Sequence, residues 1–129
     1  SSYANFTLDK NPSPQESMGL ATILVSDFSG IIFDFFFVYE KPVVVIESDI
    51  DVGGFEAEDV EHNVWEIEML DKVATIIKED EIENIASIIK NVLKKDITKD
   101  IINLRDKSIF NFGNASRVAV DQIIEIRGR

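Results

Sequence analysis

The segment from Ser26 to Phe35, SDFSGIIFDF, places two carboxylates, two hydroxyls and a glycine inside one of the most apolar parts of the chain. Where a strand of a parallel sheet passes into a helix, free backbone N–H groups converge and can bind phosphate. Ser29 is placed to cap the following helix, and Gly30 lets a ligand approach the main chain because it lacks a Cβ. Ile31 completes this junction. The segment therefore suggests binding of a small phosphorylated ligand.

The polar residues of this segment also have purely structural interpretations. Ser29 can be only a helix cap, and Asp27 can satisfy a turn, since such motifs are common. Asp34 lies five residues after Ser29 on the helix, where a carboxylate is costly unless it is paired or faces a ligand. A ribose diol would satisfy Asp34, and so would solvent or an ion pair with Lys41. Spacing alone leaves these alternatives open.

The hydrophobic pattern around the segment predicts a compact βαβ unit. Ala21–Val25 is a continuous apolar run, which predicts a strand covered on both faces. Gly30–Tyr39 is apolar nearly all round and predicts a buried helix, which Lys41-Pro42 ends. Val43–Ile46 predicts a second buried strand. Two strands joined by such a short crossover helix are expected to be parallel.

Weaker patterns lie on either side of this unit. Ala4–Leu8 predicts a short strand, and Pro14–Leu20 predicts a short helix with Ser13 as its N-cap. Residues 47–61 are acidic and predict a long loop. Val64–Ile77 predicts a short strand plus a helix.

The C-terminal half predicts three amphipathic helices. Their apolar residues recur at helical spacing: Ile82, Ile85, Ala86, Ile88, Ile89, Val92 and Leu93 in the first, Ile97, Ile101 and Leu104 in the second, and Ala115, Val118, Ala119, Ile123 and Ile126 in the third. Asp80 and Glu83 are placed as a capping pair for the first helix. We therefore expect one α/β domain over residues 1–129, with a Rossmann-like parallel sheet and flanking helices.

The composition limits the kinds of partner. A net charge of -11 and a pI near 4.4 argue against nucleic acid or an anionic membrane surface as a partner, because both are bound mainly through Lys and Arg. The absence of cysteine excludes disulfides and thiolate chemistry. No apolar run approaches the roughly 18 residues that would span a bilayer, and no signal peptide is recognisable, so a cytoplasmic location is expected.

The passage from Glu16 to Ile46 resembles the CDP-glycerol glycerophosphotransferase family, the polymerases of teichoic-acid and related capsule polymers. Members carry an element like A-D-x-L-I-[ST]-D-[FY]-S-[SG]-I-I-F-D-F, followed by K-P and an apolar strand. The match runs through Ser26, Asp27, Phe28, Ser29, Gly30, Ile31, Ile32, Phe33, Asp34, Lys41 and Pro42. The segment Phe112–Ser116 also resembles the entry to the family's last helix, which extends the likeness to about Ile126.

The resemblance implies a two-lobed glycosyltransferase-B fold whose C-terminal lobe binds the CDP-activated polyol donor. This chain would be part of that lobe, inactive without the N-terminal lobe of the same protein. Asp27, Ser29 and Gly30 would lie at the donor pyrophosphate and Asp34 near the ribose. A polyol-phosphate unit would pass to a hydroxyl of a polymer acceptor, with CMP leaving. No cofactor or metal is expected, and the full-length protein would provide any membrane association at the inner face of the cell membrane.

Two features depart from the family pattern. The family's histidine-containing segments have no counterpart, since the only histidine, His62, lies outside any matched motif and is expected to be an exposed loop residue. The acidic loop after Ile46 stands where members often have an arginine-glycine element. It lacks calcium-loop spacing and is expected to be solvated. The catalytic residues therefore stay unidentified.

Two other function classes compete with the transferase. A nucleotide-sugar 2-epimerase-like lobe shares a D-S-G-G-x-x-E-E version of the junction, but Phe28 and Ile31 replace its aspartate and second glycine. A non-catalytic α/β interaction domain would need Ser29 only as a cap. A preference for cytidine over uridine separates the transferase from the epimerase.

Overall fold

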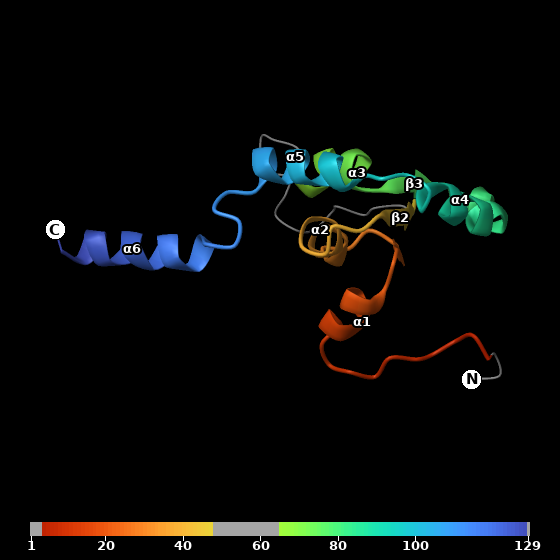
Figure 1. The fold of residues 1–129 in the computed structure, drawn as a ribbon, viewed down its shortest axis with the longest axis horizontal. Helices are drawn as coiled ribbons and strands as arrows, with labels where there is room; N and C mark the ends of the chain where they lie inside the picture. Colours follow the sequence, from red (N-terminus) through yellow and green to blue (C-terminus); the bar gives the residue numbers. More distant parts are fainter. Residues whose placement is uncertain (1–3, 48–64, 129) are drawn as a thin grey trace, which may run out of the picture.

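The computed structural model describes residues 4–47 and 65–128, which form a mixed α/β structure around a small parallel sheet (Figure 1). The sheet has the order β1 (Leu24–Ser26), β2 (Val43–Ile46), β3 (Thr75–Ile77). Both strand pairs are parallel, with Leu24 opposite Val43 and Val44 opposite Thr75. Helix α2 (Ile31–Phe37) connects β1 to β2. The predicted parallel βαβ unit is therefore confirmed.

The described residues contain six further helical segments. They are α1 (Gln15–Leu20), α3 (Trp65–Val73), the 3₁₀ helix η2 (Glu79–Asn84), α4 (Ile85–Val92), α5 (Thr98–Ser108) and α6 (Ala115–Arg127). Within the described residues, no helix is long and apolar enough to cross a membrane.

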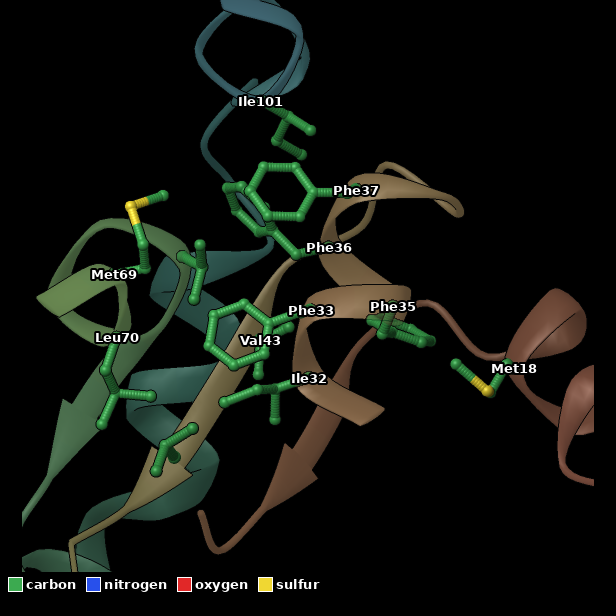
Figure 2. Packing of buried hydrophobic residues seen from close by; sticks show 12 residues of the cluster. Met18, Ile32, Phe33, Phe35, Phe36, Phe37, Val43, Met69, Leu70 and Ile101 are labelled. Atoms are coloured by element: carbon green, nitrogen blue, oxygen red, sulfur yellow. The ribbon is translucent and has the colours of Figure 1, made fainter. Parts of the chain in front are cut away.

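Helix α2 is the centre of the hydrophobic core because five of its seven residues are buried: Ile32, Phe33, Phe35, Phe36 and Phe37. It contacts α3, α5, β1 and β2. Figure 2 shows Met18 of α1 pointing toward Phe35 and Ile101 of α5 toward Phe37. Burying a side chain of this size stabilises the fold by about 1.5–3 kcal/mol. The apolar character of this helix is thus explained by packing on nearly every side.

Strand β2 is covered on both faces, as its continuous run of apolar residues predicted. Val43 and Val45 belong to the cluster around α2. Val44 belongs to a second cluster with Ile77 and with Val92 of α4. The sheet therefore has helices packed against both of its faces.

The structure corrects several sequence predictions in the N-terminal part of the chain. Strand β1 is an edge strand on which Val25 is exposed, so the prediction that this run is covered on both faces was wrong. Ala4–Leu8 is not a strand, and the described sheet consists of β1, β2 and β3, so this prediction was wrong. The predicted helix of Pro14–Leu20 is confirmed from Gln15. Pro14 rather than Ser13 occupies the N-cap position, so the prediction of Ser13 as the N-cap was wrong, although the Ser13 hydroxyl accepts a 3.4 Å hydrogen bond from the N–H of Gln15.

The middle of the chain differs in detail from the prediction. The strand and helix expected in Val64–Ile77 are both present among its described residues, but the helix comes first. The helix expected from Ile82 begins instead with a 3₁₀ segment, and its start is satisfied by Glu81, whose Oε2 accepts from the N–H of Lys78 at 2.9 Å. The predicted capping pair of Asp80 and Glu83 was therefore wrong.

The last two helices have opposite relations to the core. Helix α5 buries Ile101 completely against α2. Helix α6 is present as predicted but has no buried residue, and it projects away from the body (Figure 1). The connection between them contains Asn111 and Gly113, both with positive φ, which turn the chain outward.

Candidate functional site

The candidate site begins where β1 ends at Ser26 and α2 starts at Ile31. Asp27 is exposed, and its Oδ1 accepts a 3.4 Å hydrogen bond from the Ser26 hydroxyl. The first turn of α2 is hydrogen-bonded to the backbone carbonyls of the preceding loop. The N–H of Ile32 donates to the carbonyl of Ser29 and the N–H of Phe33 to the carbonyl of Gly30, each at 3.2 Å. The predicted strand-to-helix junction is therefore in place.

Ser29 does not cap α2 with its hydroxyl. Gly30 occupies the N-cap position, and no side chain makes a capping hydrogen bond there. The reason is that the carbonyls of Ser29 and Gly30 already accept from the N–H groups of Ile32 and Phe33. The capping prediction was wrong, and the Ser29 hydroxyl is not committed to that role.

Gly30 is not needed for an unusual backbone conformation. Its φ of -56° and ψ of -25° are ordinary right-handed helical values. A Cβ at this position would meet no atom of the described residues within 4 Å. The space beside the main chain is therefore open, as an approaching ligand would require.

Asp34 is exposed on α2 and shares one face with the half-buried Ile31 and with Val38, the exposed C-cap residue, at i, i+3 and i+7 spacing. Its carboxylate therefore escapes the burial cost that the apolar sequence suggested. The alternative pairing with Lys41 is wrong, because the Lys41 ammonium donates to the carbonyls of Gly19 at 2.6 Å and Met18 at 3.3 Å. A cation at these last carbonyls of α1 is favourable.

Asp34 lines a groove of about 350 Å³ between α1 and this face of α2. Its lining consists of Ser13, Pro14, Gln15, Met18, Ile31, Asp34, Val38 and Tyr39. One wall is fixed by the Tyr39 hydroxyl, which donates to the carbonyl of Gln15 at 3.2 Å. The groove offers a carboxylate, an amide and hydroxyls, which are suitable partners for a ligand rich in hydroxyl groups.

The structure thus brings two of the five predicted site residues, Ile31 and Asp34, into one groove. Asp27, Ser29 and Gly30 precede α2 and are not among its lining residues. Sequence reasoning missed Ser13, Gln15 and Tyr39. The spacing of the exposed residues along α2 locates one wall, but no sequence signal indicated that α1 would form the other.

No group of three or more His, Asp or Glu residues within the described ranges could hold a metal ion. His62 and the acidic loop lie outside the described residues, except for Glu47 at the start of that loop. The N–H of Glu47 donates to the carbonyl of Ile77 at 2.8 Å, which holds the ends of β2 and β3 together. No described residue can be assigned a catalytic role on this geometry.

Comparisons with known proteins add no family. No family model matches the chain, and searches of curated proteins and of solved structures return no match either.

Proposed function

We propose that the chain is the donor-binding part of a CDP-polyol glycerophosphotransferase, which transfers polyol-phosphate units to a cell-wall or capsule polymer. In this proposal the small parallel sheet belongs to the C-terminal lobe of a glycosyltransferase-B fold, and an N-terminal lobe completes the active cleft. The observation that carries the proposal is the position of SDFSGIIFDF. This segment spans a strand-to-helix junction in a parallel sheet, and its Asp34 lines the groove against α1.

The proposed donor lies along the face of α2 that carries Asp34. Its pyrophosphate occupies the open space beside Gly30, and a ribose hydroxyl donates to Asp34 further along the helix. Ser29, whose hydroxyl makes no capping bond, is free to donate to a phosphate oxygen. Asp27 has the same sign of charge as the pyrophosphate, so its role is to order the loop with Ser26.

The reaction itself needs little covalent chemistry from this lobe. The acceptor hydroxyl attacks the phosphorus bonded to the polyol, the bond to the CMP oxygen breaks, and CMP leaves with the electron pair. Holding the donor in line for this attack is the contribution proposed for this chain. The other lobe would supply proton transfer, and the full-length protein would work in the cytoplasm at the inner face of the cell membrane.

The first experiment is an amide NMR titration with CDP, UDP and pyrophosphate. We expect shifts concentrated at residues 27–31 and saturation at lower CDP than UDP. Preference for UDP would favour the epimerase-like lobe instead. Absence of any shift with all three ligands would contradict the proposal and favour the non-catalytic interaction domain, for which the exposed amphipathic helix α6 is the specific observation.

The variant Gly30→Ala tests the proposed phosphate position directly. The native φ suits alanine and the added methyl group meets no described atom, so stability should be unchanged or raised by about 0.4–1 kcal/mol. CDP affinity should nevertheless fall at least about tenfold, which corresponds to about 1.4 kcal/mol. The matched control is Gly19→Ala in α1, where the new Cβ makes only an ordinary 3.8 Å contact with Tyr39. Equal CDP affinity in the two variants would contradict the assignment of Gly30.

A further inference from the structure

A cavity of about 200 Å³ lies at the amino ends of β2 and β3, whose first residues, Val43 and Thr75, both line it. The three strands are parallel, and the junction with α2 follows the carboxyl end of β1. The cavity is therefore at the opposite end of the sheet from that junction. It also shares no lining residue with the groove that contains Asp34.

The inner wall of this cavity is apolar. Phe36 and Val73 belong to the buried cluster around α2, and Val92 of α4 belongs to the cluster on the other face of the sheet. Their side chains offer dispersion contacts but no hydrogen-bonding group. A ligand that fills the cavity therefore needs an apolar body.

Charged side chains of both signs line the same cavity. They are Lys72 in the last turn of α3, Lys95 after α4 and Asp100 in the first turn of α5. None of the three makes an ion pair with another described residue. The Lys72 ammonium lies 3.9 Å from the sulfur of Met69, and a thioether is only a weak acceptor. The cavity thus carries two cations and one anion that do not neutralise each other.

The lack of ion pairs at the two lysines contrasts with the composition of the chain, which has 24 acidic and 13 basic residues. A ligand carboxylate has two oxygens and can accept from both ammonium groups, in hydrogen bonds that charge strengthens. A ligand ammonium can donate to Asp100 in the same way. A zwitterion therefore satisfies all three side chains, whereas a plain carboxylic acid or a plain amine leaves charges without a partner.

We propose that this cavity binds an aliphatic α-amino acid, whose side chain packs on the apolar wall while its two charged groups meet Lys72, Lys95 and Asp100. The size agrees with such a ligand, since the cavity is smaller than the about 300–1,000 Å³ of pockets for drug-sized molecules. The site is independent of the proposed donor site, because it uses other residues at the other end of the sheet.

An amide NMR titration of the 129-residue chain with leucine tests the binding. We expect shifts at residues 72–75 and 92–100 and a Kd between about 10 μM and about 1 mM, because so small a ligand makes few contacts. Glycine, which lacks the apolar body, should bind more weakly. So should 4-methylpentanoate and 3-methylbutylamine, which lack the amino and the carboxyl group of leucine respectively. No shift at about 10 mM leucine, or equal binding of leucine and any of these three compounds, would overturn the proposal.

Two substitutions test the assignment of the charges. Lys95→Met should weaken leucine binding about threefold to fivefold, the effect of losing one partly exposed ion pair. Its matched control is Lys94→Met, at an exposed lysine that does not line the cavity.

Asp100→Asn should weaken leucine binding by a similar factor but leave the affinity for 4-methylpentanoate unchanged or raised, because that compound has no ammonium group. Asp71→Asn, at an exposed residue outside the cavity, is its control. Equal leucine affinity in each variant and its control would overturn the proposal. The dispersion of the amide spectrum shows that each variant is folded.

Discussion

At the scale of single residues, Arg105 joins parts of the chain that are distant in sequence. Its Nη1 donates to the carbonyl of Phe37 at 3.0 Å and to Glu40 Oε1 at 2.6 Å. Its guanidinium carbon lies 4.2 Å from the ring centroid of Phe112. Glu40 has a φ of 54°, which is uncommon for a residue with a side chain, so the ion pair holds a strained position.

Arg105→Met should therefore lower the free energy of unfolding. We expect a loss of about 1.5 kcal/mol, the lower end of the range for hydrogen bonds to charged groups, because Glu40 is 37% exposed. Urea unfolding measures it. Arg117→Met removes an exposed ion pair and should change the free energy by less than about 0.5 kcal/mol. Similar losses in the two variants would mean that Arg105 has no special structural role.

Asp9 provides a residue-scale prediction about pH. Its carboxylate accepts from the Ser17 hydroxyl and from the N–H of Asn11, and these two hydrogen bonds lower the pKa of Asp9 below its ordinary value of 3.8. A carboxylate whose pKa is lowered by folding stabilises the fold above its unfolded pKa, and the contribution is lost as pH falls through the folded pKa. The contact between the N-terminal segment and α1 should thus loosen below about pH 4.

Ser17→Ala should raise the pKa of Asp9 because it removes the larger of the two causes. An NMR titration of the Asp9 carboxyl carbon measures this shift directly. Ser87→Ala, at an exposed serine in α4, serves as the control and should leave that titration unchanged. An unaltered Asp9 pKa in Ser17→Ala would contradict this account.

At the scale of elements, α2 should dominate stability. Phe35→Ala removes a fully buried ring, for which a loss of about 3–5 kcal/mol is typical. Phe110→Ala makes the same chemical change where the ring is 85% exposed and should cost less than about 0.5 kcal/mol. Urea unfolding of both variants checks the difference. Comparable losses would contradict the placement of the core around α2.

The sequence predicted an element well where the element has a long run of apolar residues or is followed by a residue that ends a helix, such as proline. The junction of β1, α2 and β2 is an example, since α2 is apolar on nearly every side and Lys41-Pro42 follows it. Strand order is not contained in periodicity, so the edge position of β1 could not be predicted. The side chain of Ser29 illustrates the same limit in the site, because its role depends on which acceptors the loop brings closer.

At the scale of the whole molecule, an amphipathic pattern does not tell whether its apolar face is covered. The helices α5 and α6 were both predicted from apolar spacing, yet only α5 packs against α2 within the described structure. Their difference arises from the connection through Asn111 and Gly113, whose backbone directs α6 outward. The candidate groove is a similar case, since it depends on how α1 lies against α2.

The whole-molecule arrangement predicts that the body does not need α6 for its stability. Deleting residues 115–129 should change the free energy of unfolding of the dilute monomer by less than about 0.5 kcal/mol, because no residue of α6 is buried. Urea unfolding at low chain concentration measures this. A loss above about 1 kcal/mol would mean that α6 packs on its own body. Hydrogen exchange in the intact chain gives an independent check, since the amides of a helix that does not pack on the body should exchange freely.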